Sequence, residues 1–262
     1  MMIHEKIYDL YLPYRGAQKR VRVFVPEHEE NETLPVIYMT DGQNLFEDDA
    51  VQFGCWYTRE AVRAERAATG MAAMIVGIFN DDGEKERTGD LTPKTIGALL
   101  PREELKGVTP RGEEFDAFVV STVMPAVEAR FPVEKGRNAT AFCGSSSGGL
   151  QSFFTALSHP DLFCAAGVFS PAFLLYAPED MRRWIDAAVR DKMPYLFLYT
   201  GAGDPLEQDI YESVEWTYDL LLERYPMHLL NEIVLPEERH HEKAWAPMFR
   251  DFLHTFLARR AD

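Results

Sequence analysis

The feature that most restricts the fold of this chain is a series of short apolar runs separated by longer amphipathic stretches. Uniformly apolar runs of four to eight residues are typical of strands in a parallel sheet, because helices cover both faces of such a sheet. These runs lie at 35–40, 72–78, 139–143, 165–170, 195–200 and 229–235. The run at 20–25, RVRVFV, alternates instead and is typical of a half-buried strand.

The stretches between the runs carry apolar residues at helical spacing. In 113–131, apolar side chains recur every three or four residues, and Pro125 is expected to kink this helix. The same period appears at 181–191, 213–225 and 244–260. Strands that alternate with helices predict an α/β fold with a mostly parallel central sheet and helices on both faces.

The chain has 262 residues and no internal repeat or Gly/Ser-rich linker, so we expect one domain spanning 1–262. The charged, turn-rich segment 79–114 is expected to be a surface excursion beside a cleft.

Net charge excludes some classes of partner. The formal charge is −15, whereas nucleic acids and anionic membranes attract clustered positive charge, so neither is expected as a partner. The first residues do not form a signal peptide, and no run of 18 apolar residues is present, which predicts a cytoplasmic protein. The three cysteines lack the spacing of a disulfide framework or a zinc site.

The stretch CGSSSGGL (143–150) follows an expected strand and precedes an expected helix. Gly144 to Gly148 fit the pattern G-x-S-x-G with Ser146 at its centre, the nucleophile elbow of α/β-hydrolases. The central serine needs a strained backbone to raise its hydroxyl above the sheet, so small residues must lie two positions away on each side. A frame centred on Ser147 has Ser145 where the first glycine belongs, and a frame centred on Ser145 has Cys143 there. Ser146 is therefore the predicted nucleophile, although a simple Gly/Ser helix cap would have a similar sequence.

A serine nucleophile needs a base that is oriented by an acid, in the chain order Ser, acid, His. The run at 195–200 leads into GAGDPLEQD, where Asp204 is the predicted acid and Glu207 and Asp209 are the alternatives. His240 and His241 follow the last strand and are the candidate bases. With Glu242 they could suggest a metal site, but no third ligand is positioned, so neither a metal nor a cofactor is expected.

The tetrahedral intermediate of acyl transfer needs two backbone N–H groups that point at its oxyanion. One donor is expected from Ser147, which follows the nucleophile, and the other from the loop DGQNLFEDD after the run at 35–40. Gly42 would let this loop approach the substrate, so Gln43 is the second predicted donor.

Aromatic side chains in the loops expected near the cleft give a hint of substrate class. Phe46, Trp56, Phe173 and Tyr176, with Leu174, could line a rim for a sugar or phenolic ester, or could equally belong to the core. The chain carries no large helical insertion of the kind that covers lipases, so long-chain triglycerides are not expected.

Several motifs together resemble those of the putative-esterase family of α/β-hydrolases, over about residues 7–257. That family includes carbohydrate acetyl and feruloyl esterases, siderophore esterases, formylglutathione hydrolase and mycolyl transferases. The similar segments are VIYMTDGQNLFED, IVGIFND with RTGDLTP, FCGSSSGGL with SHPDLFCAAGVFSPAF, and HHEKAW. The resemblance implies that the base lies five residues before Trp245, which selects His240 over His241, with Ser146 as nucleophile and Asp204 as acid.

The chain departs from the family pattern at Glu238-Arg239, where glycine usually precedes the histidine, and at Asp90-Leu91, which replace Glu-Tyr. Both departures are expected beside the cleft and concern the substrate more than the chemistry.

The resulting prediction is a carboxylic ester hydrolase acting on small-molecule esters of small acyl or aromatic acids, including esters on carbohydrate. The alternatives are a siderophore or lactone esterase, an acyltransferase of the same fold, and a non-catalytic binding module.

Overall fold

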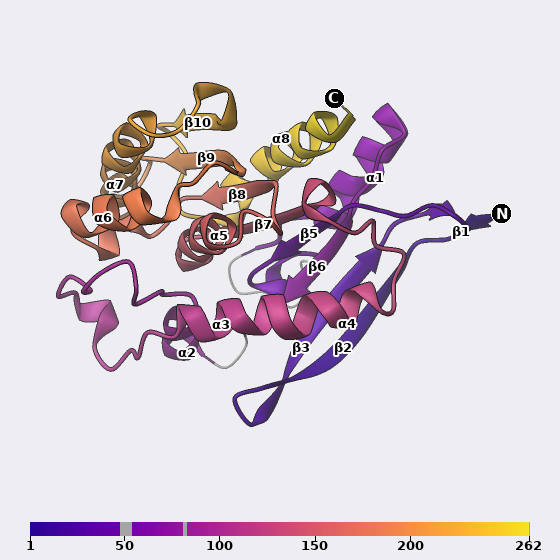
Figure 1. Cartoon of the computed structure of the whole chain (residues 1–262), viewed down its shortest axis with the longest axis horizontal. Helices are drawn as coiled ribbons and strands as arrows, with labels where there is room; N and C mark the ends of the chain where they lie inside the picture. Colours follow the sequence, from indigo (N-terminus) through magenta and orange to yellow (C-terminus); the bar gives the residue numbers. More distant parts are fainter. Residues whose placement is uncertain (48–53, 81–82, 262) are drawn as a thin grey trace.

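The computed structural model describes residues 1–47, 54–80 and 83–261, and its centre is a twisted sheet with helices on both faces (Figure 1). The sheet has eight strands in the order β10-β9-β8-β7-β5-β6-β3-β2, and every neighbouring pair from β6 to β10 is parallel. This confirms the predicted α/β fold class with its mostly parallel sheet.

The parallel strands coincide with the uniformly apolar runs of the sequence. They are β5 (Val36–Met39), β6 (Met74–Ile78), β7 (Thr140–Ser145), β8 (Ala165–Phe169), β9 (Tyr195–Gly201) and β10 (Leu230–Leu235). All but β10 are buried along their whole length, as expected for strands covered on both sides.

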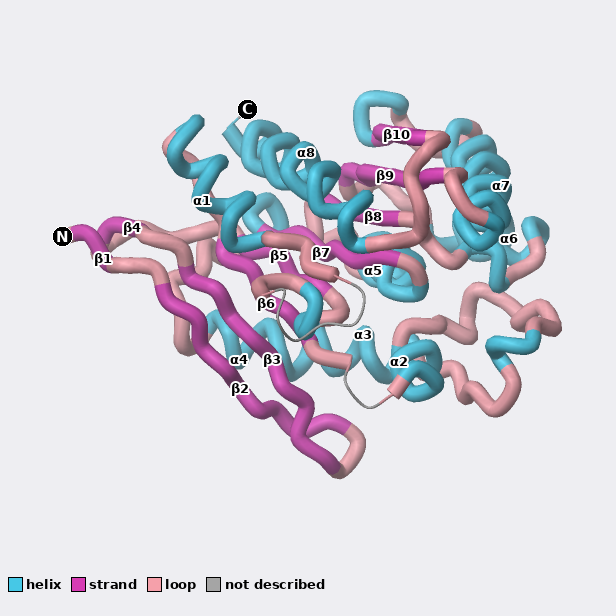
Figure 2. The backbone as a smooth tube through the Cα atoms, turned by 180° about the vertical axis from the view of Figure 1, so that it is seen from behind, coloured by secondary structure: helices cyan, strands magenta, loops and turns pink. Residues whose placement is uncertain are grey.

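An antiparallel hairpin extends the sheet at its other edge and reaches beyond the helices (Figures 1 and 2). It consists of β2 (Lys6–Tyr14) and β3 (Ala17–Val25), joined by Arg15 and Gly16, both with positive φ, as in tight hairpin turns. The sequence pattern indicated β3 but missed β2, because this edge strand is mostly exposed. Two short strands, β1 (Met2–Ile3) and β4 (His28–Glu29), form a separate antiparallel pair.

Two hydrophobic clusters lie on opposite faces of the sheet, because alternate residues of a strand point to opposite sides. Val36 and Tyr38 of β5 belong to one cluster, and Ile37 and Met39 belong to the other. The first face is covered by α3, α4, α5, α6 and α7, and the second by α1 and α8, which pack against each other (Figure 2). The α-helices are α1 (Thr58–Thr69), α2 (Glu84–Asp90), α3 (Gly112–Phe118), α4 (Met124–Glu128), α5 (Ser147–Ser158), α6 (Pro178–Ala188), α7 (Pro205–Leu222) and α8 (Glu242–Ala261).

Short helical turns complete the fold. They are η1 (Gly42–Asn44), η2 (Glu103–Leu105), η4 (Arg137–Ala139), η5 (Phe173–Leu175) and η6 (Met227–Leu229), all 3₁₀, and η3 (Val119–Val123), which is π-helical. The helix predicted over 113–131 is α3, η3 and α4 in succession. Pro125 has no N–H for the helical ladder and its ring crowds the preceding turn, so a wider π-turn just before it relieves the crowding.

The carboxyl ends of β5, β7, β8 and β9 meet at one edge of the sheet, since these strands are parallel. The loops after them contain Gln43, Ser146, Ser170 and Asp204, so the topology gathers the predicted chemistry at this edge. No helix among the described residues is long and apolar enough to cross a membrane.

Candidate active site

Ser146 lies between the end of β7 and the start of α5 in a strained conformation. Its φ of 59° and ψ of −125° are rare for a residue with a side chain. The surrounding backbone holds it firmly, because its amide donates to Phe169 O at 3.0 Å and its carbonyl accepts from Ala172 N at 3.1 Å. The turn is therefore rigid, and it has the geometry of a nucleophile elbow.

The two glycines of the G-x-S-x-G pattern are required by close packing against β5. A Cβ atom at Gly144 would lie 2.5 Å from Thr40 Oγ1, and one at Gly148 would lie 2.2 Å from the same atom. Both distances are shorter than real Cβ contacts, so larger residues would push the turn away from the sheet. Contact with Thr40 is therefore a specific reason why both residues must be small.

His240 forms its side-chain hydrogen bond with Glu207 and not with Asp204. The Nδ1 atom of His240 lies 2.6 Å from Oε2 of Glu207, whose side chain is completely buried. The prediction that Asp204 orients the imidazole is therefore wrong, and the alternative, Glu207, occupies that position. Asp209, the other alternative, is exposed and lies 3.9 Å from Arg102.

Asp204 instead holds the backbone around the site. One carboxylate oxygen accepts from Glu207 N at 2.9 Å and caps α7, and the other accepts from His240 N at 3.0 Å. Burial opposes ionisation of Asp204, but these two N–H groups outweigh it and lower the pKa of the carboxyl below its usual value.

A signal for this arrangement is present in the sequence DPLE (204–207). Aspartate before proline marks the N-cap and first residue of a helix, and Asp204 caps α7 through Glu207 N. With Asp204 engaged in capping, the carboxylate of Glu207 in the first helical turn meets the histidine.

The second oxygen of Glu207 is held by three donors on two neighbouring strand ends. Gly201 N donates to Oε1 at 2.8 Å, Ser170 Oγ donates to the same atom, and Thr200 Oγ1 adds a longer contact of 3.4 Å. Ser170 in turn accepts from Trp245 Nε1 at 2.9 Å. The buried charge thus has a full set of partners.

The same contacts connect the glutamate to the elbow and to the imidazole. Ser170 follows Phe169, whose carbonyl binds the amide of Ser146. The Trp245 ring packs edge-on against His240, with centroids 5.0 Å apart. Ser146, His240 and Glu207 are thereby linked through Ser170 and Trp245 at the carboxyl edge of the sheet.

The two predicted oxyanion donors lie on η1 and at the first residue of α5. The amide of Ser147 is at the N-terminus of α5, where N–H groups have no partner inside the helix and attract negative charge. Gly42 has a different role from the one expected. A Cβ there would lie 2.6 Å from the carbonyl carbon of Gly77, so this glycine seats the loop against the end of β6.

The loop that carries Gln43 is fixed by a buried ion pair. Asp41, at φ 55°, accepts from Arg87 Nε at 2.6 Å and from Nη2 at 2.9 Å. Although burial opposes ionisation, the charge and hydrogen bonds of Arg87 keep the pKa of Asp41 below its usual value. The Gln43 side chain accepts from Asn80 N at 3.1 Å, which ties the loop to the segment after β6.

His241 does not contribute to this cluster. Its Nδ1 accepts from Lys243 N at 3.0 Å, so the ring helps to cap α8. Within the described parts of the chain, no group of three or more His, Cys, Asp or Glu residues is arranged to hold a metal ion.

The aromatic residues predicted to line the cleft are core residues. Trp56 packs between Phe169 and Trp245, and Phe46 packs near Phe24. Phe173 contacts Phe153, and Tyr176 is buried with its hydroxyl donating to the carbonyl of Pro93. Leu174 is also buried. The prediction of an aromatic rim from these side chains is wrong, because their apolar surface is used to join the loops to the sheet.

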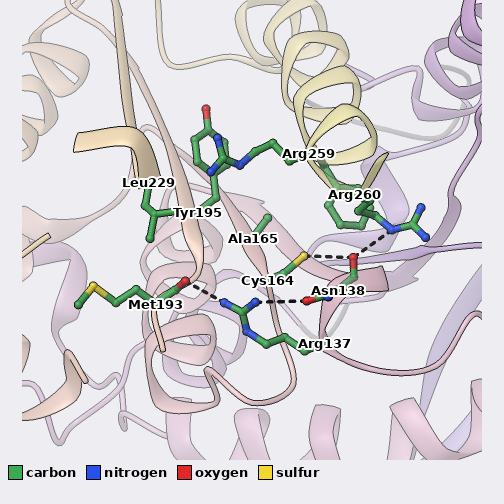
Figure 3. A pocket seen from close by; sticks show the side chains of 10 residues that line it. Arg137, Asn138, Cys164, Ala165, Met193, Tyr195, Leu229, Arg259 and Arg260 are labelled. Carbon is green, nitrogen blue, oxygen red and sulfur yellow. Dashed lines mark hydrogen bonds between the residues drawn. The ribbon is translucent and has the colours of Figure 1, made fainter. Parts of the chain in front are cut away.

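A hollow of about 230 Å³ lies at the opposite edge, near the amino ends of β8 and β9 (Figure 3). Three arginines line it, but two of them donate mainly to protein oxygens. Arg137 binds the carbonyls of Pro160 and Met193, and Arg260 binds Asn138 O and Glu134. Arg259 lies over the ring of Tyr195. None of the predicted catalytic residues lines this hollow, so we place the candidate active site at the carboxyl edge.

The chain was also compared with known protein families. The model of the family described as "Putative esterase" matches residues 14–195, which include the loop of Gln43 and the turn at Ser146. The chain belongs to this family.

One curated relative in sequence is the siderophore triacetylfusarinine C esterase of Aspergillus fumigatus. It is 31% identical over 168 residues, which cover 60% of this chain and 52% of the relative. The chain thus spans about half the length of that relative.

Solved structures with the same fold cover nearly the whole chain. Siderophore hydrolase EstA from Aspergillus nidulans has a TM-score of 0.76 at 20% identity and covers 97% of this chain and 94% of its own. A ferulic acid esterase has a TM-score of 0.70 at 15% identity, covering 97% and 98%. The enterobactin esterase FES from Shigella flexneri has a TM-score of 0.73 at 16% identity, covering 97% and 59%.

One of the two departures from the pattern of the esterase family lies in the interior. Asp90 is buried between Lys19, 3.3 Å away, and Arg111, 3.0 Å away, and Leu91 is fully buried. The expectation that Asp90-Leu91 lie beside a cleft is therefore wrong. Glu238 and Arg239 have exposed side chains directly before His240, and the Glu238 carbonyl accepts from Gly203 N at 2.8 Å. That this second departure concerns the substrate stays a prediction.

Proposed function

We propose that this member of the esterase family is a serine hydrolase of carboxylic esters, with Ser146 as nucleophile, His240 as base and Glu207 as acid. The observation that carries the proposal is the 2.6 Å hydrogen bond between His240 and the fully buried Glu207, at the same edge of the sheet as the strained turn at Ser146. An alcohol is a poor nucleophile, and a histidine held in one tautomer by a carboxylate is the arrangement that activates it.

In the proposed reaction, Ser146 Oγ attacks the ester carbonyl while Nε2 of His240 takes the hydroxyl proton. Glu207 stabilises the imidazolium that forms, and the amides of Gln43 and Ser147 bind the oxyanion, each being worth roughly 3 kcal/mol. Collapse of the tetrahedral intermediate breaks the bond to the alcohol, which leaves with the proton from His240. Water then attacks the acyl-enzyme by the same route in reverse and releases the acid.

For the substrate we propose esters of small acyl or aromatic acids. A siderophore ester is the second candidate, and the sequence relative from Aspergillus fumigatus favours it, since that protein is a siderophore esterase. A carbohydrate ester has less support, because the aromatic residues that suggested it are buried in the core.

A fluorophosphonate probe tests the class of activity. Folded protein is expected to be labelled at Ser146 and to hydrolyse p-nitrophenyl acetate, and absence of both would favour a non-catalytic binding module. A screen of acetyl, butyryl and feruloyl esters, acetylated xylo-oligosaccharides and a catecholate siderophore then separates the substrate classes by kcat/KM.

A further inference from the structure

A hydrogen bond connects the oxyanion loop directly to the segment that carries the histidine. Asn44 is the last residue of η1, and its Nδ2 donates to Oε1 of Glu242 at 3.0 Å. Glu242 is the first residue of α8 and follows His240 by two positions. The two residues that it joins are 198 positions apart in the sequence.

Glu242 is placed where a carboxyl group destabilises the fold. Its side chain is only 4% exposed, and within the described residues its Oε2 has no hydrogen-bond partner. Burial, and then the nearby charge of Asp41, raise the pKa of Glu242 to about 7. A buried carboxyl group with one oxygen unpaired lowers the free energy of unfolding. Stabilisation of the core therefore does not account for the presence of Glu242 and its one hydrogen bond.

Asn44 is held by two further hydrogen bonds around the predicted oxyanion donor. Its amide donates to Asp41 O at 2.9 Å, and its carbonyl accepts from Trp56 N at 2.8 Å. The amide of Gln43 lies between Asp41 and Asn44 in sequence, so the loop is anchored on one side by Arg87 and on the other by Glu242. With both anchors in place, the direction of the Gln43 amide is fixed.

We propose that the Asn44–Glu242 hydrogen bond is a positioning device that holds the oxyanion loop in register with His240. The inference rests on the proposed serine esterase function, and neither side chain is assigned a contact with the substrate. The donor and the base must face the same carbonyl group, and misplacement of a catalytic group by about 1 Å can cost a hundredfold in rate. Oxyanion contacts strengthen in the transition state, so loss of register lowers kcat more than it raises KM.

The test is a double-mutant cycle with Asn44→Ala, Glu242→Ala and the double variant, using p-nitrophenyl acetate. Each single change is expected to lower kcat about 10- to 100-fold with KM changed less than about threefold. The double variant is expected to be no slower than the slower single variant, because both remove the same bond. Glu242→Gln keeps an acceptor for Asn44 and is expected to restore kcat to within about threefold.

Glu232 provides a matched control. It is a partly buried carboxyl on β10 with a pKa also raised to about 7, chiefly by burial, and it does not contact η1 or His240. Glu232→Ala is expected to leave kcat unchanged. If Glu242→Ala fails to fold, Asn44→Ala and the near-isosteric Asn44→Asp, which removes the donor, carry the test, and each is expected to lower kcat at least tenfold.

Three results would overturn the inference: additive losses in the cycle, a Glu242→Gln variant as slow as Glu242→Ala, or normal kcat in Asn44→Ala. These outcomes are distinct from failure of the proposed function. If the unmodified protein is not labelled by fluorophosphonate at Ser146, the function itself is wrong. If it is labelled and hydrolyses the ester while Asn44→Ala does so at full rate, only the positioning role is wrong.

Discussion

Replacement of Glu207 by glutamine tests which carboxylate orients the histidine. In the structure, Oε2 of Glu207 faces His240 Nδ1, while Oε1 accepts from the fixed amide of Gly201. Glutamine has one oxygen and one NH₂ group, so only one of these two positions keeps an acceptor. The substitution changes shape very little, which makes it a test of chemistry more than of packing.

The expected decrease in kcat follows from the two possible orientations of the glutamine side-chain amide. If the NH₂ group faces His240, Nδ1 must accept, and the proton moves to Nε2, where it blocks attack by Ser146. If it faces Gly201, two donors meet in a buried site at a cost of about 1–3 kcal/mol. In both cases the imidazolium loses its countercharge, so kcat is expected to fall about 10³- to 10⁴-fold, equivalent to about 4–5.5 kcal/mol of barrier.

The assay is steady-state hydrolysis of p-nitrophenyl acetate, with Asp204→Ala as the matched variant. Asp204 caps α7 and holds His240 N, so its loss is expected to lower the free energy of unfolding by roughly 2–4 kcal/mol. Its kcat is expected to stay within about tenfold, because the imidazole keeps its Glu207 partner. A Glu207→Gln enzyme with near-normal kcat, together with an inactive but folded Asp204→Ala enzyme, would refute the assignment.

Three further expectations concern the elbow and the buried carboxyl. Ser146→Ala is expected to lower kcat by about 10⁴- to 10⁶-fold, whereas Ser145→Ala retains activity within tenfold, and fluorophosphonate labelling of Ser146→Ala would contradict this. Gly148→Ala is expected to lose about 1–3 kcal/mol in urea unfolding, since its Cβ would meet Thr40 Oγ1 at 2.2 Å, and Thr40→Ala should recover part of that loss. Glu242 faces Asp41, Arg87 and Asn44, and its pKa is about 7 in the folded protein, against the ordinary 4.5. Between these two pH values the folded protein keeps a proton that the unfolded chain releases. The free energy of unfolding therefore falls as the pH rises from 4.5 to about 7. Glu242→Gln removes this term and should gain roughly 3 kcal/mol relative to the parent protein between pH 4.5 and pH 7, and an unchanged difference in urea unfolding across these pH values would contradict it.

The parts of the fold that could be predicted are those fixed by local pattern. The uniformly apolar runs identified the parallel strands because burial on both faces leaves no room for polar side chains. The elbow was identifiable because strand, tight turn and helix are consecutive in sequence, so Gly144, Ser146 and Gly148 are constrained by each other and by the neighbouring strand.

The remainder depends on contacts between distant segments. Glu207 and Asp204 are three residues apart, and although DPLE indicates that Asp204 is a helix cap, the position of His240, more than thirty residues later, decides which carboxylate meets the ring. The sequence also could not show whether Trp56 lines a cleft or belongs to the core. The residues that bury it, Phe169 and Trp245, lie on other elements.

The polar contacts at the carboxyl edge explain why several separate motifs accompany the elbow. Asp41–Arg87 joins DGQN to RTGD, Asn44–Glu242 joins DGQN to HHEKAW, and Ser170 joins FSPAF to both Glu207 and Trp245. Parallel strands bring these loops to one edge of the sheet. The backbone alone does not fix the distances between the loops as closely as catalysis requires. Side-chain bonds between loops remove that freedom. Since these bonds are buried or partly buried, they are expected to constrain the proposed nucleophile, base and oxyanion donors without contacting the ester. Differences in substrate are then expected to arise from other, exposed loop residues at the same edge.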